Sequence, residues 1–223
     1  MEMLKDRPFF CSWSGGKDSC LALYRAIQQG GRPCTLLTML SEDGLTTHSH
    51  GLPRQLIEEQ AECLSMNTVF RHASWQQYEE EFISALREIK QAGIDVGVFG
   101  DIDLDEHRDW VLRVCISEGI TPVHPLWKQD RRGLLEEFID LGFTAQVIVV
   151  NEKMLDRQFL GQFITKWTIT GMEKAGIDPA GELGEYHTVV TNGPIFSHEV
   201  KIHPEETVFR EGYWYRKVRL RES

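Results

Sequence analysis

One stretch near the N-terminus decides the fold, and it reads Cys11-Ser12-Trp13-Ser14-Gly15-Gly16-Lys17-Asp18-Ser19. Residues 9–13 are apolar enough for a short buried strand, and from Cys20 onward apolar residues recur at helical spacing. The residues between them must therefore form the turn that joins a strand to a helix. Adjacent glycines lack Cβ atoms and so let an anion approach the backbone N–H groups. Serines and a lysine add side-chain donors, and the N-terminus of the helix adds the positive end of its dipole. The stretch predicts a phosphate-binding site.

This loop differs from the Walker A sequence, in which Gly, four residues, Gly-Lys and then Ser or Thr follow one another. Cys11 stands where the first glycine would be, and Asp18 follows the lysine. The run Ser14-Gly15-Gly16-Lys17-Asp18-Ser19 instead resembles the SGGxDS loop of the PP-loop ATP pyrophosphatases. That resemblance implies that the loop binds the β- and γ-phosphates of ATP, which is cleaved between its α- and β-phosphates. The alternative is a plain glycine turn.

The composition limits the classes of function. The 223 residues include 24 basic and 34 acidic side chains, which gives a formal net charge of −10 and argues against a main role in nucleic-acid binding. The hydrophobic fraction of 41% is sufficient for a core. No apolar run of about 18 residues and no signal peptide stands in the sequence, so we expect no membrane partner and a cytoplasmic protein.

Five cysteines stand at positions 11, 20, 34, 63 and 115. Their number is odd, they contain no C-x-x-C pair, and they lack the usual spacings of zinc knuckles. We therefore expect reduced thiols in a cytoplasmic protein, with Cys11 and Cys20 packed in the core.

The first half of the chain alternates apolar strands with helix-length connections. The helix that opens at Pro53 would bury Gln60 together with apolar residues, and a second helix is expected over 78–89. The further strands are expected at 34–40, 68–72 and 96–100. This alternation predicts an α/β fold with an open parallel sheet and right-handed crossovers.

A domain boundary is expected after this sheet. Two prolines make 122–127 an extended connector, because proline disfavours helix at itself and at the residue before it. We therefore predict an ATP-binding domain over residues 1–125 and a substrate domain over residues 126–223.

The second half has a different pattern. A helix is expected over 131–141 and a strand over 146–150, and the stretch around 155–163 is less regular. Aromatic and β-branched residues alternate in 195–202 and 207–220, which predicts a β-hairpin.

Ligands of open parallel sheets bind at the carboxyl ends of the strands, which selects Gly100, Asp101 and Asp103 after the strand over 96–100. The two carboxylates are close enough in sequence to approach one Mg²⁺, an ion that prefers carboxylate and phosphate oxygens. The structural alternative is that Asp103 or Asp105 caps the next helix.

A second polar stretch reads Gly181-Glu182-Leu183-Gly184-Glu185-Tyr186-His187-Thr188. Glu185 and His187 alternate in an extended strand and would share a face, while Glu182 lies on a turn flanked by glycines. Three chemistries fit: an amine or cation held by the glutamates, deprotonation of a nucleophile by His187, or a metal held by all three side chains. Zinc fits less well, because no second histidine stands nearby at ligand spacing. A polar loop is the structural alternative.

Together these motifs resemble the diphthine–ammonia ligase family of PP-loop proteins, over nearly the whole chain. The resemblance rests on Ser14 to Ser19, Gly100-Asp101-Ile102, Pro125-Leu126-Trp127, Leu160-Gly161, Gly181 to Thr188 and Asn192-Gly193-Pro194-Ile195-Phe196. It implies a HUP-type, adenine nucleotide α-hydrolase-like domain with the PP-loop after its first strand, joined to a smaller C-terminal α+β domain. Two positions depart from the family pattern: Leu183 stands where glycine is common, and His50 lies in a segment that matches only loosely.

The resemblance implies an ATP-dependent carbon–nitrogen ligase. MgATP would bind residues 14–19 with Gly100 and Asp101, and a substrate carboxylate would be adenylated with release of pyrophosphate. Ammonia or another amine would then displace AMP and leave an amide. The acceptor would be the diphthine of translation elongation factor two if the family substrate is retained, or another carboxylate. A homodimer is among the expected assemblies.

The same resemblance assigns roles to single residues. The catalytic residues would be Lys17, Asp18, Glu185 and His187; the substrate-binding residues would be Glu182, Glu185, His187 and Thr188; and Asp101 would hold Mg²⁺. Three alternatives remain: a PP-loop enzyme that modifies tRNA, an ATP-binding sensor without turnover, and a metal-dependent hydrolase built on the second stretch.

Overall fold

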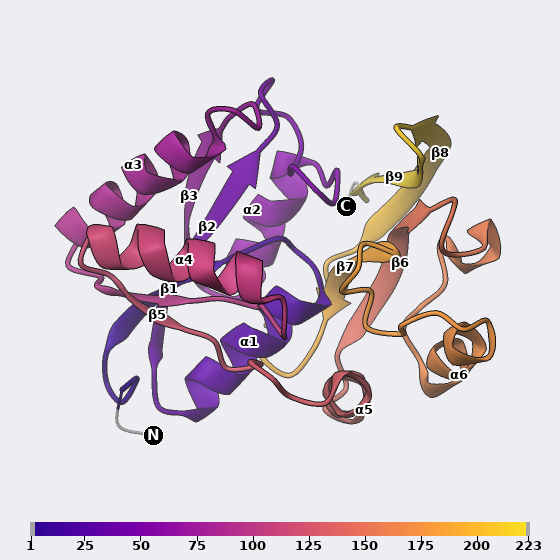
Figure 1. Cartoon of the computed structure of the whole chain (residues 1–223), viewed down its shortest axis with the longest axis horizontal. Helices are drawn as coiled ribbons and strands as arrows, with labels where there is room; N and C mark the ends of the chain where they lie inside the picture. Colours follow the sequence, from indigo (N-terminus) through magenta and orange to yellow (C-terminus); the bar gives the residue numbers. More distant parts are fainter. Residues whose placement is uncertain (1–2, 222–223) are drawn as a thin grey trace. The chain divides into compact units, whose positions relative to one another are not determined.

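The computed structural model describes residues 3–221, which form two compact units (Figure 1). The first unit comprises the residues up to Ser14, Asp18–His48 and Ser65–Lys128. The second comprises Gly15–Lys17, Ser49–Leu64 and the chain from Gln129 onward. No helix in the described part of the chain has both the length and the apolar character needed to cross a membrane.

The first unit is built on a five-stranded sheet, all parallel, in the order β3-β2-β1-β4-β5. Its strands are β1 (Pro8–Ser12), β2 (Arg32–Leu40), β3 (Asn67–His72), β4 (Val96–Val98) and β5 (Thr121–Val123), and its helices are α1 (Lys17–Gln28, of which Lys17 counts with the second unit), α3 (Tyr78–Gln91) and α4 (Asp105–Ser117). The chain runs outward from β1 through β2 and β3, then returns to place β4 on the other side of β1. The strand order therefore reverses between β1 and β4, which is where such sheets bind ligands.

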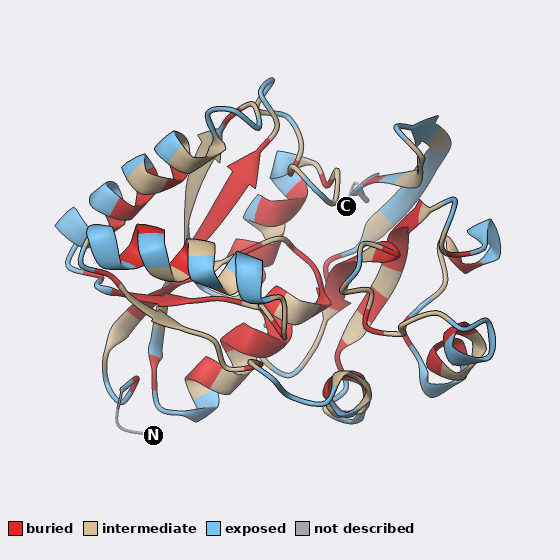
Figure 2. Cartoon of the chain, viewed as in Figure 1, coloured by how far each residue is buried: buried red, intermediate tan, exposed pale blue. Residues whose placement is uncertain are grey.

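A single apolar cluster holds the helices α3 and α4 against the sheet. Phe10 of β1, Leu37 of β2, Phe82 and Leu86 of α3 and Val111 of α4 are among its buried members. Figure 2 shows that buried and exposed residues alternate along both helices, with the faces toward the sheet buried and the outward faces exposed. The apolar residues that recur every 3.6 positions along each helix therefore form the stripe that packs against the sheet.

The second unit carries a four-stranded antiparallel sheet in the order β7-β6-β9-β8. Its elements are α2 (Arg54–Cys63), α5 (Arg131–Asp140), β6 (Thr144–Asn151), the 3₁₀ helix η1 (Arg157–Phe159), α6 (Lys166–Lys174), β7 (Tyr186–Asn192), β8 (Ile202–Arg210) and β9 (Tyr213–Leu220). The predicted fold class, an open parallel α/β sheet with the PP-loop after its first strand and a smaller C-terminal α+β region, is confirmed.

The predicted C-terminal hairpin exists, but its strands lie elsewhere. The turn falls at Glu211-Gly212, within the stretch expected to be one strand, and residues 195–201 form no strand. Glu211 and Gly212 have φ values of 54° and 86°. Two consecutive positive φ angles are typical of a type I′ hairpin turn, and glutamate is an uncommon residue for its first position.

Two further local features were not anticipated from the sequence. Helix α6 lies in sequence to which no helix was assigned, because Gly171 and two threonines, Thr168 and Thr170, give it low helix propensity. Its first turn is instead held by a capping box between Thr165 and Thr168. The aspartate cap of α4, given above as the structural alternative for Asp103 or Asp105, is absent, since the N-cap position is Leu104 and makes no side-chain hydrogen bond.

The connector expected at 122–127 begins as a strand. Thr121–Val123 pairs in parallel with β4 at the edge of the sheet, and Pro122 is tolerated because an edge strand has one unpaired side. His124 is therefore the first residue beyond a strand end.

Candidate functional site

The loop after β1 turns sharply at its glycines. Gly15 has a φ of 81°, in the left-handed region, and a Cβ atom there would lie 2.6 Å from Leu52 Cδ1. A Cβ on Gly16 would lie 2.5 Å from His50 Cε1 and 3.2 Å from the backbone oxygen of Thr188. Both positions therefore need glycine, the first for conformation and space and the second for space alone.

Within the first unit, β4 ends close to the start of α1. A Cβ on Gly100 would lie 2.9 Å from Asp18 C and 2.9 Å from Ser19 N, so the two backbones touch at this point. The hydroxyl oxygens of Ser14 and Ser19 lie 3.2 Å apart, and Ser19 is buried. The strand order brings the residues after β1 and β4 together, since adjacent parallel strands end at the same edge.

Asp101 lies at this edge beside a histidine that the sequence did not single out. His124 Nε2 is 3.4 Å from Asp101 Oδ2, and His107 Nδ1 is 3.9 Å from Asp101 Oδ1. The His124 ring stacks on Phe99 with centroids 5.4 Å apart, and among the described residues its buried Nε2 has no partner with hydrogen-bond geometry. Burial, with the added charge of Asp101, raises the pKa of Tyr78 to about 12. The strand-end rule would have selected His124 had β5 been predicted.

Within the second unit, Lys17 meets the second polar stretch. Its backbone N–H donates to Thr188 Oγ1 at 3.1 Å, and its ammonium nitrogen lies 5.2 Å from the centroid of the Tyr186 ring. Lys17 and Thr188 are both buried. The predicted Thr188 thus contacts the loop itself, while Tyr186, which carried no predicted role, offers the lysine a cation–π contact.

Two imidazoles lie beside this lysine. His50 Nδ1 is 2.8 Å from the backbone oxygen of Thr188, and the rings of His50 and His187 have centroids 4.6 Å apart. Burial, followed by the charges of His50 and Lys17, lowers the pKa of His187 well below its ordinary value of 6.5. His187 is therefore a neutral imidazole at physiological pH, and a neutral imidazole is able to accept a proton.

Glu185 is almost fully buried, and its carboxylate accepts a hydrogen bond from the Leu183 N–H at 2.9 Å. Glu185 directly precedes β7, so its side chain and that of His187 are two residues apart at the start of the strand. Glu182 is partly exposed, and its N–H donates to Asp178 Oδ2 at 3.4 Å.

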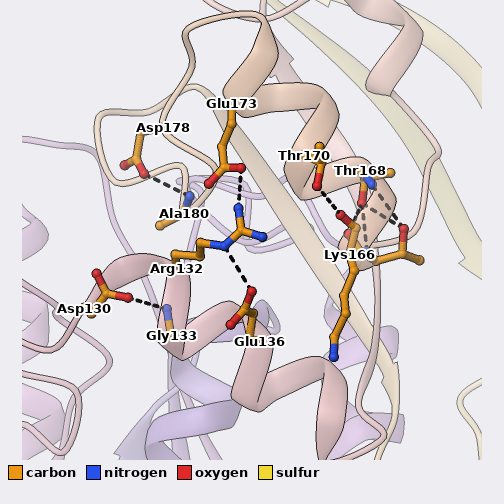
Figure 3. A network of polar contacts seen from close by, with 11 residues as sticks. Asp130, Arg132, Gly133, Glu136, Lys166, Thr168, Thr170, Glu173, Asp178 and Ala180 are labelled. Carbon is orange, nitrogen blue, oxygen red and sulfur yellow. Dashed lines mark hydrogen bonds and ion pairs between the residues drawn. The ribbon is translucent and has the colours of Figure 1, made fainter.

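The segment before this stretch is anchored by polar contacts. In Figure 3, Arg132 of α5 joins Glu136 of the same helix to Glu173 of α6, and Asp178 accepts from the Ala180 N–H at 3.0 Å. Asp130 caps α5 by accepting from the Gly133 N–H at 2.7 Å. These contacts hold the chain as it enters the glycine-flanked turn.

Gln60 of α2 holds the loop from another side. Its Nε2 donates to the backbone oxygens of Gly15, at 3.2 Å, and Val190, at 2.7 Å, and the side chain is fully buried. A polar residue on the predicted inner face of this helix was the sequence signal, although no role was assigned to it.

Gln60→Leu is expected to lower the free energy of unfolding by about 1–3 kcal/mol, because the shape is largely kept while buried carbonyl oxygens lose a donor. Urea denaturation measures the change. Gln55→Leu, at an exposed position of the same helix, is the matched control and should change stability little. Equal stabilities for the two variants would contradict this role of Gln60.

The predicted site residues thus form two described groups. Ser14, Asp18, Ser19, Gly100 and Asp101 belong to the first unit, and Gly15, Gly16, Lys17, Glu182, Glu185, His187 and Thr188 belong to the second. In the first group Gly100 packs against the backbone of Asp18 and Ser19, and in the second Thr188 contacts Gly16 and Lys17. The contacts described for Glu182 and Glu185 are with Asp178 and Leu183 instead. Their functional roles remain predictions.

Two family descriptions match the chain. The Diphthamide synthase N-terminal domain matches residues 9–122, and the Diphthamide synthase C-terminal domain matches residues 130–221. Together they span both polar stretches.

Curated relatives carry one name. The chain is 26% identical over 217 residues to a diphthine–ammonia ligase of Schizosaccharomyces pombe, covering 87% of this chain but only 36% of that protein. It is 25% identical over 223 residues to the diphthine–ammonia ligases of Rattus norvegicus and Homo sapiens, covering 87% of this chain and 82% of each relative. The chain thus spans about four fifths of the length of the mammalian relatives and about a third of the Schizosaccharomyces pombe protein.

Proposed function

Because the chain belongs to the diphthamide synthase family, we propose that it uses ATP to join ammonia or an amine to a substrate carboxylate. It is an ATP-dependent carbon–nitrogen ligase. The observation that carries the proposal is the SGGKDS run, which follows β1 where the strand order reverses, with Gly100 after β4 in backbone contact with Asp18 and Ser19. A helix start at the switch point of a parallel sheet suits phosphate.

The first step is adenylation. A carboxylate oxygen of the acceptor attacks the α-phosphorus of ATP, the bond from that phosphorus to the bridging oxygen breaks, and pyrophosphate leaves. The buried ammonium of Lys17 stabilises the negative charge that develops on the departing phosphates. Residues 14–19 bind the β- and γ-phosphates, with Gly100 and Asp101 at the neighbouring strand end.

A magnesium ion fits the donors at Asp101. Mg²⁺ is usually held by one or two carboxylates together with substrate phosphates and water, and Asp101 supplies one carboxylate at the end of β4. His124 Nε2, 3.4 Å from that carboxylate, is suited to contact a ligand oxygen nearby. The ion would supply charge neutralisation of the triphosphate.

The second step forms the amide. The nitrogen lone pair of ammonia attacks the acyl carbon, the bond from carbon to the AMP oxygen breaks, and one proton leaves the nitrogen. His187, held neutral by its surroundings, accepts that proton, and Glu185 orients the attacking amine. Glu182 and Thr188 complete the substrate-binding set.

The relatives' name, diphthine–ammonia ligase, supports diphthine as the acceptor. Diphthine on translation elongation factor two is the acceptor if this chain keeps the family reaction, and another carboxylate takes its place otherwise. We assign ATP binding to residues 1–125 and acceptor binding to residues 126–223, in a cytoplasmic enzyme, with a homodimer among the proposed assemblies.

The test is the set of products. With ATP, Mg²⁺, ammonium and diphthine-bearing elongation factor two, the enzyme should release AMP and pyrophosphate in step with amide formation, read by mass spectrometry of the factor. Release of ADP and phosphate contradicts the proposed cleavage. ATP binding without any product indicates a sensor.

Glu185→Gln and His187→Gln are expected to slow amide formation by about 10²–10⁴-fold, the usual contribution of a positioned proton-transfer group, while leaving the affinity for ATP within about threefold. Single-turnover assays separate pyrophosphate release from amide formation. Glu152→Gln, at an exposed position after β6, is the matched control. Full amide formation by both variants would remove the second polar stretch from the reaction.

A further inference from the structure

Three side chains of metal-ligating type in the second unit lie close together outside the two polar stretches. Glu59 and Cys63 lie one turn apart on α2, and His198 comes from the segment between β7 and β8. Cys63 Sγ is 3.3 Å from His198 Nε2, and Glu59 Oε1 is 3.2 Å from the same nitrogen. The three donor atoms all lie within 4.8 Å of one another.

The direction of these contacts separates a metal site from a nucleophilic triad. In a triad the carboxylate contacts one imidazole nitrogen and the nucleophile contacts the other. Here the thiol and the carboxylate both face Nε2, while Nδ1 lies 3.0 Å from Ser197 Oγ. When Nδ1–H donates to that hydroxyl, the Nε2 lone pair is free to bind a cation, and the sulfur and the carboxylate oxygen lie within 4.8 Å of it and of each other.

The separations match tetrahedral zinc. Zn–S bonds of about 2.3 Å and Zn–N or Zn–O bonds of about 2.0–2.1 Å place sulfur and nitrogen about 3.5 Å apart, and nitrogen and oxygen about 3.4 Å apart, at tetrahedral angles. The observed 3.3 Å and 3.2 Å are within a few tenths of an ångström of these values. Small side-chain adjustments therefore suffice to form the site.

We propose that Glu59, Cys63 and His198 bind one Zn²⁺ ion, with water as its fourth ligand. Thiolate and imidazole select zinc over magnesium, which prefers oxygen ligands alone. Access is open on one side, since the His198 and Glu59 side chains are 53% and 31% exposed while Cys63 is buried. Glu62, on the same helix, adds a further negative charge near Cys63, which favours a cation.

The ion would fasten the segment after β7 to α2. The Ser197 N–H already donates to the backbone oxygen of Cys63 at 2.9 Å, so the two segments meet without metal. The neighbouring Gln60 of the same helix donates to the backbone of Gly15. Zinc therefore stabilises the helix that supports the loop, independently of the reaction proposed above.

The test is metal content and Co²⁺ spectroscopy of the purified full chain. Wild-type protein, loaded with Zn²⁺ and desalted, should retain about one ion per chain, and Co²⁺ should give the intense visible bands of a tetrahedral site together with a thiolate-to-cobalt charge-transfer band. Cys63→Ser should lose the charge-transfer band, and His198→Ala should weaken Zn²⁺ binding by at least about a hundredfold. Cys34→Ser, whose thiol lies outside the cluster, is the matched control.

Several results overturn the proposal. They are wild-type protein that retains no zinc after desalting, six-coordinate Co²⁺ without a thiolate band, or zinc binding that is unchanged in both variants. If Cys63→Ser fails to fold, the Co²⁺ spectrum of the wild-type chain decides alone. None of these measurements uses ATP, so a failure of the zinc site would not contradict the proposed ligase activity, and the reverse also holds.

Discussion

Lys17→Ala is expected to reduce pyrophosphate release by about 10²–10³-fold or more, the loss that follows removal of one preorganised group from a site of developing charge. Lys17 is buried and its ammonium nitrogen lies 5.2 Å from the centroid of the Tyr186 ring. In the variant, water that enters the site would therefore stabilise the phosphate charge less well than the ammonium does. A coupled pyrophosphate assay under saturating ATP measures the effect. The affinity for ATP should fall less than the turnover, since the charge on the phosphates is greatest in the transition state.

The control for this experiment is Lys153→Ala, at an exposed position, which should keep full activity. A circular dichroism melt of Lys17→Ala distinguishes lost chemistry from lost folding, because the cation–π contact with Tyr186 is worth only about 0.5–2 kcal/mol. Activity that survives Lys17→Ala but disappears on chelation without ATP would favour the metal-dependent hydrolase instead.

The parallel sheet could be predicted because its signals are local. Each apolar strand is followed by a helix-length connection, and the run from Ser14 to Ser19 has the residue types of a phosphate loop within six consecutive positions. Element types of this kind depend on residues that are neighbours in sequence. Two elements were missed because their residue types are unusual for the structure they adopt. Gly171 disfavours the helix α6, and Glu211 does not indicate a hairpin turn because glutamate seldom adopts a positive φ.

The candidate site could be predicted only as separate pieces. The two polar stretches were found from the sequence. The contact between the Lys17 N–H and Thr188 was not, because the two residues are 171 positions apart and no spacing motif in the sequence indicates such a contact. The same holds for Cys63 and His198, which are 135 positions apart. The cysteine spacings therefore gave no metal signal, although the tertiary structure brings a thiol, an imidazole and a carboxylate together.

Gly100→Ala is expected to lower kcat/KM for ATP by about a hundredfold, because the added methyl group would meet backbone and not a movable side chain. Its Cβ would lie 2.9 Å from Asp18 C, 2.9 Å from Ser19 N and 3.1 Å from Asp18 O. The end of β4 must then move away from the start of α1, and a displacement of about 1 Å in a phosphate site is enough for such a loss. The same overpacking should lower the free energy of unfolding by about 1–3 kcal/mol.

Gly171→Ala is the matched control, since a Cβ at this helical position would meet Phe159 Cε1 at an ordinary 3.5 Å. It should raise the free energy of unfolding by about 0.5–1 kcal/mol and leave kcat/KM unchanged. The two measurements together decide what the glycine after β4 does. If Gly100→Ala loses stability but keeps its kcat/KM, then the close approach of β4 to α1 supports folding alone, and the phosphates of ATP do not depend on it.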